Sequence, residues 1–177
     1  IVTTDVFLVE DATQCNFTNV GFVGALTVAS ITSSLASDNI AGVRFASTLS
    51  SVCTQINFNN CYFSGLTYGI NTAQQAEGVV VSNSEFDTLY QGIVLGDGGA
   101  TNGGASGFRA VSNSFDSIYA EGIVYDQVTN NVSAYNMFYD VGNGYTVSPT
   151  SSIVRFGYDN NVSMSDMFER VITDSNT

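Results

Sequence analysis

An internal repeat of phenylalanine limits what this chain can fold into more than any other feature does. The repeated residues are Phe17, Phe63, Phe86, Phe115, Phe138 and Phe168. The first interval is 46 residues, two later intervals are 23 residues, and the other two are 29 and 30 residues. Because 46 is twice 23, we expect a degenerate copy of the repeat near Ile40, and extra residues in two of the later copies.

Two further columns of apolar residues keep a constant spacing to the phenylalanines. Aliphatic residues stand three positions later, at Val20, Leu66, Leu89, Ile118, Val141 and Val171. A small residue precedes an aliphatic one at Gly42-Val43, Gly69-Ile70, Gly92-Ile93, Gly122-Ile123 and Ser152-Ile153. Apolar residues alternate within each copy as in strands, and Gly, Asn, Ser and Asp separate the segments as turns. The pattern predicts an all-β single domain over residues 1–177: a parallel β-helix, a solenoid of about seven coils stacked about 4.8 Å apart.

Asparagine precedes four of the phenylalanines, at Asn60, Asn83, Asn113 and Asn136, and its offset shortens by one between Asn83 and Asn113. With this Asn-x-x-Phe or Asn-x-Phe turn and the Gly-Ile strand, the chain from about Cys15 to Val171 resembles the right-handed β-helix proteins of the pectate-lyase-like superfamily. The resemblance implies a single-stranded right-handed β-helix with an asparagine ladder at one corner. The superfamily includes pectate lyases, polygalacturonases, phage tailspikes and bacterial adhesins, so the resemblance specifies architecture more than function.

The charge balance excludes several functions. The chain has 16 acidic and 4 basic residues, a net charge of −12, and neither lysine nor histidine. We therefore expect no binding to nucleic acid and no attraction to anionic membranes. Histidine-based triads, histidine metal sites and lysine Schiff bases are excluded by composition. No apolar run reaches the roughly 18 residues of a membrane span, so we expect no membrane insertion.

A pair of aspartates is the strongest candidate for catalysis. Asp87 and Asp116 each follow a repeat phenylalanine, so stacked coils would place their backbones about 5 Å apart. Retaining glycosidases hold two carboxyl groups about 5–5.5 Å apart. Glu85 and Glu121 are possible third members of the group. The alternatives are solvated turn residues, which we favour, or a calcium site, in which case calcium would be the only cofactor.

Tyrosine and arginine supply the other candidate contacts. Tyr90 and Tyr119 each follow a column residue, so we expect them to stack and face outward, where they could contact a glycan or a neighbouring subunit. Arg109 and Arg155 are weaker candidates that could project beside the carboxylates. The glycine-rich loop 96–104 and the insertion 143–152 are expected to project from the rod as recognition loops.

The cysteines and the glycosylation sequons give further expectations. The repeat spacing predicts that Cys15 and Cys61 share a position two coils apart, too far for a disulfide, so we expect these two and Cys53 to be reduced. Asn16, Asn131 and Asn161 begin sequons, which matter only in a secreted eukaryotic protein.

Three functional hypotheses follow from the predicted fold and the missing catalytic chemistry. The first is a structural and glycan- or receptor-binding segment of a virus particle, such as a phage tailspike or tail fibre. The resemblance to tailspikes implies a homotrimer, other virion proteins as partners and a host surface polysaccharide as ligand, in the virion or outside the cell. The second is a polysaccharide depolymerase that uses Asp87 and Asp116, although we favour a protein without enzymatic activity. The third is a bacterial surface adhesin. Because no capping helix is evident at either end, we expect a segment of a longer chain.

Overall fold

The structure is a computed structural model that describes residues 5–31, 40–46, 53–72, 76–95, 106–125, 130–142, 154–156 and 162–169. Within these ranges the protein is all-β, and every strand pair in them is parallel. A short 3-10 turn, Val28–Ser30, is the helical element of the described part. The predicted all-β class is therefore confirmed.

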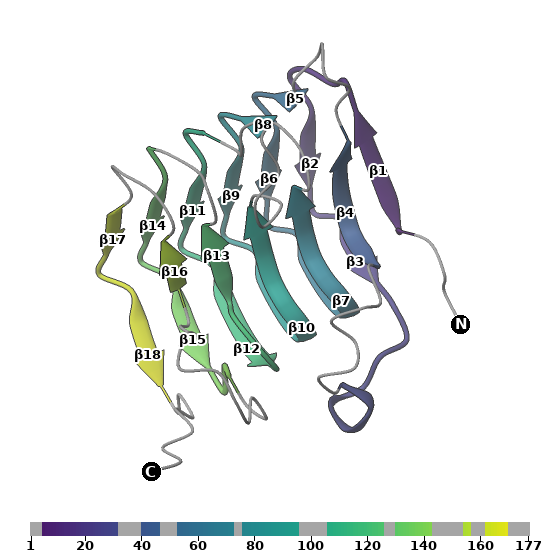
Figure 1. Cartoon of the computed structure of the whole chain (residues 1–177), viewed down its shortest axis with the longest axis vertical. Coiled ribbons are helices and arrows are strands. Elements are labelled where there is room, and N and C mark those ends of the chain that lie inside the picture. The colour runs from purple at the N-terminus through teal and green to yellow at the C-terminus, as the bar shows by residue number, and fades with distance from the viewer. Residues whose placement is uncertain are drawn as a thin grey trace.

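The strands form three sheets (Figure 1). The large sheet contains β1 (Phe7–Glu10), β3 (Gly21–Val23), β4 (Ala41–Ala46), β7 (Tyr62–Thr72), β10 (Glu85–Leu95), β12 (Ser114–Ile118), β13 (Ile123–Tyr125), β15 (Met137–Tyr139), β16 (Val154–Phe156) and β18 (Met167–Glu169). The second sheet contains β2 (Asn16–Thr18), β6 (Asn57–Asn59), β9 (Val80–Ser82), β11 (Arg109–Val111), β14 (Val132–Ala134) and β17 (Val162–Met164). The small third sheet pairs β5 (Cys53–Thr54) with β8 (Ala76–Glu77).

Each sequence repeat contributes a strand to the second sheet and then one or two strands to the large sheet, and successive repeats stack side by side (Figure 1). The phenylalanine column is confirmed from the third copy onward: Phe63 pairs with Phe86, and the register continues through Phe115 to Phe138 and Phe168. Rings of successive repeats lie parallel, with centroids 4.6 Å apart between Phe63 and Phe86. These rings form a continuous stack within the core, beside aliphatic residues of the same cluster.

The first repeat differs from the sequence prediction. Phe17 lies in the second sheet and pairs with Phe58, whereas Phe22 is the residue that pairs with Phe63. The first interval of the column therefore runs from Phe22 to Phe63 and is 41 residues long rather than 46. This interval is one repeat with a long insertion and not two repeats. Part of this insertion is the turn around Val28–Ser30. The second sheet has six strands, one per repeat, and β1 pairs with β4 as a strand that precedes the first of these repeats.

The Gly-Ile column is confirmed over four repeats and shifted in the last. Val43 pairs with Ile70, and the register continues through Ile93 to Ile123. Ile123 pairs with Val154, one residue beyond the position expected from Ser152-Ile153, which lies outside the described residues.

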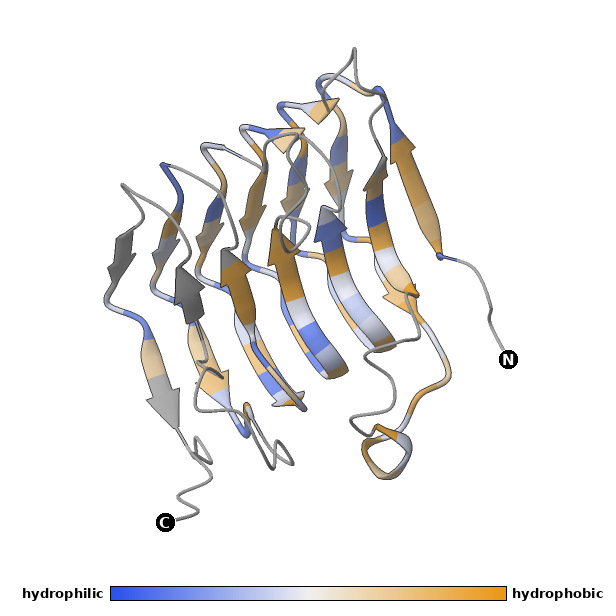
Figure 2. Ribbon diagram, viewed as in Figure 1, coloured by the Kyte–Doolittle hydropathy of each residue, from blue (hydrophilic) through white to orange (hydrophobic). Residues whose placement is uncertain are grey.

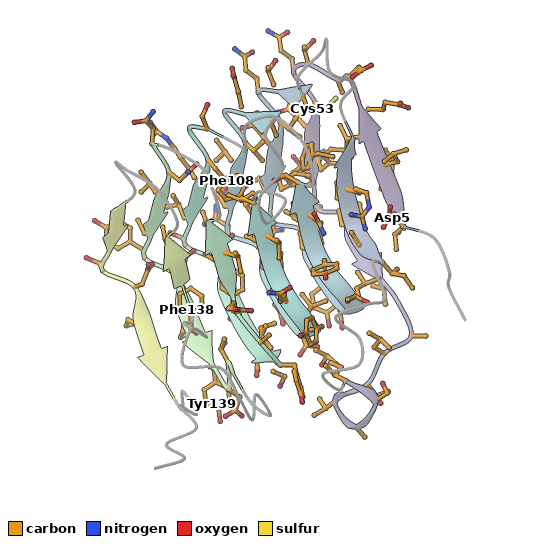
Figure 3. All side chains as sticks on the ribbon, in the orientation of Figure 1. Asp5, Cys53, Phe108, Phe138 and Tyr139 are labelled. Atoms are coloured by element: carbon orange, nitrogen blue, oxygen red, sulfur yellow. The ribbon has the colours of Figure 1, made fainter. Side chains whose placement is uncertain are left out.

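The core lies between the sheets, which turn their apolar positions toward one another (Figures 2 and 3). The glycine before each core aliphatic residue has a steric reason. A Cβ at Gly92 would collide with the carbonyl oxygen of Gly122 and would lie 2.8 Å from the ring of Phe115. A Cβ at Gly69 would lie 2.7 Å from Gly92 O. The stacked rings therefore leave no room for a side chain at this column.

Candidate functional site

The chain turns from the second sheet into the large sheet at a residue in the left-handed conformation. The six turn residues are Asn19, Asn60, Asn83, Ser112, Tyr135 and Ser165, with φ angles between 50° and 58°. Asparagine tolerates this conformation better than most residues do, because its short side chain bonds the local backbone. We call this edge of the molecule the outer corner.

A second ladder lies one residue later and points inward. The Ser84 hydroxyl accepts the Cys61 N–H at 3.0 Å, and the Asn113 carbonyl oxygen accepts the Ser84 N–H at 2.9 Å. Asn136 accepts the Asn113 N–H at 2.9 Å, and Asp166 accepts the Asn136 N–H at 2.8 Å. The side chain of each repeat thus satisfies a buried N–H of the preceding repeat at the bend.

The expected single asparagine ladder is therefore wrong. Asn60 and Asn83 are exposed turn residues, whereas Asn113 and Asn136 are buried and belong to the inward ladder. The shift by one residue in the sequence marks this change of role.

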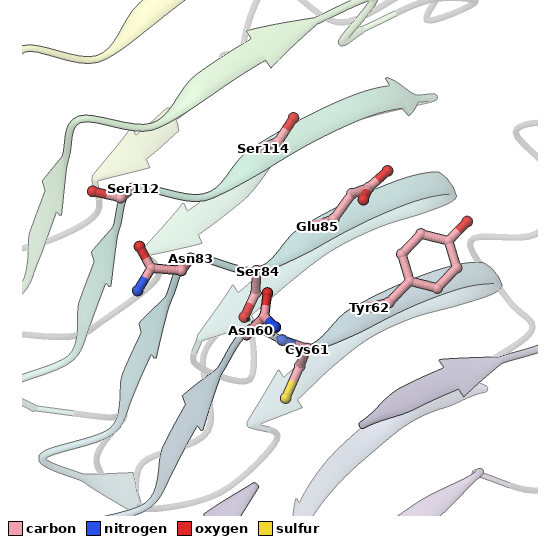
Figure 4. A pocket seen from close by; sticks show the side chains of 8 residues that line it. All are labelled: Asn60, Cys61, Tyr62, Asn83, Ser84, Glu85, Ser112 and Ser114. Atoms are coloured by element: carbon pink, nitrogen blue, oxygen red, sulfur yellow. Dashed lines mark hydrogen bonds between the residues drawn. The ribbon is translucent and has the colours of Figure 1, made fainter. Parts of the chain in front are cut away.

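The outer corner forms a shallow hollow of about 410 Å³ over three repeats (Figure 4). Its lining consists of Asn60, Cys61, Tyr62, Asn83, Ser84, Glu85, Ser112 and Ser114. Tyr62, Glu85 and Ser114 occupy one register position on β7, β10 and β12 and extend to the same side (Figure 4). The hollow therefore runs across the strands, along the direction in which the repeats stack.

The hollow combines a partly exposed aromatic ring with hydrogen-bonding groups. Tyr62 is 36% exposed, and Glu85 beside it is exposed. The Asn60 carboxamide donates to Asn19 Oδ1 at 2.7 Å and the Asn83 carboxamide donates to Asn59 Oδ1 at 3.0 Å, which fixes both amides. An aromatic face beside ordered amide and carboxylate groups suits a ligand with apolar faces and many hydroxyls.

Asp87 and Asp116 are direct neighbours on β10 and β12, as predicted. Both are half-buried on the outer side of the large sheet. Asp87 accepts hydrogen bonds from the Tyr62 hydroxyl at 3.1 Å and the Ser64 hydroxyl at 3.4 Å, and Thr88 donates to its other oxygen at 3.0 Å. The aspartate pair is thus connected to the hollow through Tyr62.

The interaction with Asp87 also affects the acidity of Tyr62. Its hydrogen bond with Ser64 lowers the pKa of Tyr62, but desolvation and the Asp87 carboxylate raise it, and the net effect is a pKa above the usual 10.0. Tyr62 is therefore a protonated donor at neutral pH.

The two glutamates expected beside the aspartates lie in different places. Glu85 shares the outer face with Asp87, since the two residues are two positions apart on one strand. Glu121 is buried between β12 and β13, where it accepts a hydrogen bond from Gln91 at 2.6 Å. The prediction that Glu121 joins the pair is wrong.

Tyr90 and Tyr119 stack as predicted, with ring centroids 5.6 Å apart and an angle of 22° between the rings. The expectation that both face solvent is wrong for Tyr90, which is only 5% exposed. It packs in a small cluster with Ile31 and Ala120, against which Leu26 and Tyr119 also pack. The insertion of the first repeat therefore covers this stack and removes Tyr90 as a contact residue.

Arg109 does not lie beside Asp87 or Asp116. Arg109 is exposed on β11 of the second sheet, whereas Asp116 lies on the large sheet. The Arg155 backbone lies on β16, and its side chain is outside the described part. Arg44 forms a bidentate pair with Asp5, with Nε–Oδ2 2.6 Å and Nη2–Oδ1 2.9 Å.

Several other predictions concern the rest of the chain. The loop 96–104 and the insertion 143–152 lie outside the described residues. All three cysteines are free, as expected. The expectation that Cys15 and Cys61 share a repeat position is wrong. Cys15 precedes β2, and its backbone carbonyl accepts the Asn57 N–H at 2.8 Å, whereas Cys61 follows β6, the strand that pairs with β2. Asn131, the first residue of a sequon, is buried and its carbonyl oxygen accepts the Phe108 N–H at 2.8 Å.

Sequence reasoning missed Tyr62 and Tyr135 as residues of the outer corner. Tyr62 could have been found, because it directly precedes the phenylalanine column and so must face outward from the strand. Tyr135 could not have been found, because the sequence does not show that the neighbouring Asn136 belongs to the inward ladder and leaves Tyr135 as the turn residue.

Comparison with known proteins gives no match to a family model, a curated protein or a solved structure. Within the described ranges, no three histidine, cysteine, aspartate or glutamate side chains are grouped as metal ligands would be. The same ranges hold no helix with the length and apolar character needed to cross a membrane.

Proposed function

We propose that the chain is a single-stranded right-handed parallel β-helix that serves as a structural, glycan-binding rod in a virus particle appendage such as a tailspike or tail fibre. The parallel register of successive repeats and the ring stack along them support the rod. Strands of neighbouring repeats pair in both the large sheet and the second sheet, so each repeat is stabilised by its neighbours along the stack.

The observation that carries the binding function is the hollow at the outer corner. It presents the Tyr62 ring and the Glu85 carboxylate in one row along the stack, and two fixed asparagine amides in a second row at the turn. Proteins bind hydroxyl-rich ligands by this combination of an aromatic platform and oriented hydrogen-bonding groups. A host surface polysaccharide is the ligand that suits an elongated site on a rigid rod.

The proposed setting is the virion or the space outside the cell. We propose a homotrimer, with other virion proteins as further partners, by analogy with the tailspikes that the sequence resembles. A net charge of −12 keeps an elongated protein soluble and suppresses non-specific association. No nucleic-acid or membrane-inserted role is proposed.

Binding to host surface polysaccharide tests this function. Tyr62→Ala removes the platform and should weaken binding at least about fivefold, the effect of losing a central contact. Tyr62→Phe keeps the ring and should retain most of it. Arg109→Gln, on the outer face of the second sheet, is the matched control and should leave binding unchanged. Equal binding by the wild type and Tyr62→Ala would contradict the proposal.

A glycoside hydrolase is the second candidate, and the pairing of Asp87 with Asp116 favours it. Neighbouring parallel strands lie about 4.8 Å apart, close to the separation of about 5–5.5 Å in retaining enzymes. In that case Asp87→Asn and Asp116→Asn each abolish release of reducing sugar while the fold is kept, and the wild type retains the anomeric configuration. Release by either variant at the wild-type rate would rule out this pair as the catalyst.

A further inference from the structure

The outer corner continues beyond the hollow. The Ser112 N–H donates to the carbonyl of Ala134 at 3.0 Å, so the next repeat places Tyr135 beside Ser112. Likewise Met137 on β15 pairs with Ser114 on β12. Tyr135 is 59% exposed and Met137 is 44% exposed. The part of the corner between Tyr62 and Tyr135 therefore has an aromatic ring at each end, with amides, hydroxyls and Glu85 between the two rings.

Tyr135 occupies its position against its backbone preference. It has φ of 55°, where a bulky side chain is strained, and the equivalent residues of the other five repeats are asparagine or serine. Its ring belongs to neither buried cluster of the described part. Within the described part, the ring therefore adds nothing to the apolar core in return for the strain, and strain of this kind is typically retained at functional sites.

The charges along the corner restrict the ligand. Glu85 and Asp87 lie on this face, whereas Arg44 is paired with Asp5 and Arg109 lies near the start of β11, away from the corner. The whole chain contains no lysine or histidine. An anionic ligand would meet carboxylates with no described cation to balance them.

We propose that the outer corner from Tyr62 to Tyr135 binds, lengthwise along the stack, an oligosaccharide that lacks carboxylate, sulfate and phosphate groups, with the two tyrosines as platforms. Three repeat steps separate the platforms, about 14 Å at the spacing of neighbouring strands. This inference rests on the proposed glycan-binding function and adds the ligand's charge class and a second platform.

Binding of the whole chain to an array of neutral, amine-bearing and acidic bacterial-surface oligosaccharides tests the inference. We expect binders only among the neutral and amine-bearing members. Tyr135→Asn should weaken binding at least about fivefold, because it removes the ring. The same substitution should leave the melting temperature unchanged or raise it, because asparagine suits the turn. Tyr135→Phe should bind as the wild type does.

The possible outcomes distinguish failure of this inference from failure of the proposed glycan-binding function. Binding that Tyr62→Ala weakens but Tyr135→Asn does not would overturn the second platform and leave the proposed function standing. A preference for acidic members would overturn the charge class alone. A melting temperature lowered by Tyr135→Asn would assign the ring a structural role instead. An array without any binder would count against both the inference and the proposed function.

Discussion

At the residue scale, the inward ladder at the outer corner distinguishes asparagines that look alike in the sequence. Asn113 is buried, its side-chain oxygen accepts the Ser84 N–H, and its Nδ2 donates to the Val81 backbone carbonyl at 3.0 Å and to Asn136 Oδ1 at 3.0 Å. Asn113→Ala should lower the free energy of unfolding by about 2–4 kcal/mol, because buried backbone groups lose their partners. Urea unfolding measures this loss.

The exposed turn residue provides the matched control for that experiment. Asn83→Gly removes one exposed hydrogen bond but places glycine in a left-handed conformation that suits it, so we expect a change below about 1 kcal/mol. Similar losses for Asn113→Ala and Asn83→Gly would show that the two positions do not differ as described.

Tyr68 gives the protein a pH dependence in alkali. Burial raises the pKa of Tyr68 above its usual 10.0, with Arg44 lowering it and Glu121 raising it. The unfolded chain therefore releases this proton first, so stability present below pH 10 is lost as the pH rises through the folded value. In urea unfolding at about pH 8 and about pH 10.5, Tyr68→Phe should lose less stability than the wild type. An identical loss in both proteins would contradict the assignment.

The sequence could predict which column residues lie next to each other in successive repeats, but not whether their side chains are exposed. The pairing of Asp87 with Asp116 and the stacking of Tyr90 on Tyr119 follow from spacing alone, and both are present. The burial of Tyr90 depends on the insertion of the first repeat, whose Leu26 and Ile31 belong to the same cluster. Spacing predicts which residues are neighbours, whereas exposure requires knowing what else covers them.

At the element scale, the glycine column controls how closely strands pack on the rings. Gly92→Ala on β10 should lower the free energy of unfolding by about 1–3 kcal/mol, because the new Cβ meets the Gly122 carbonyl and the Phe115 ring. At Gly21 on β3, an added Cβ meets only Val23 at 3.9 Å, so Gly21→Ala should leave stability unchanged or slightly raised. Thermal unfolding compares the two variants, and equal melting temperatures would contradict the packing described.

The strands of the later repeats could be placed from the sequence, and those of the first repeat could not. Phe17 and Phe22 both stack on a phenylalanine of the next repeat, Phe58 and Phe63 respectively. Because either Phe17 or Phe22 could be the first member of the phenylalanine column, the first repeat can be aligned with the later ones in two ways. The 46-residue interval happened to be twice the repeat, which favoured the wrong one.

At the scale of the whole molecule, stacking brings residues that are far apart in sequence into one line on the surface. The outer corner consists of turn residues from consecutive repeats, and neither the inner core nor the satellite cluster around Tyr90 shares them. Any ligand that lies along the corner must therefore contact segments separated by a full repeat. This requirement links the proposed function directly to the fold.

Chemical-shift mapping by NMR tests that link most directly, on the 18.7-kDa chain titrated with its best-binding array oligosaccharide. The account predicts that the perturbed amides fall in separate groups around residues 60–62, 83–85, 112–114 and 135–137, with the rest of the spectrum little changed. Perturbations confined to one stretch of sequence, or centred on Tyr90 and Tyr119, would contradict it.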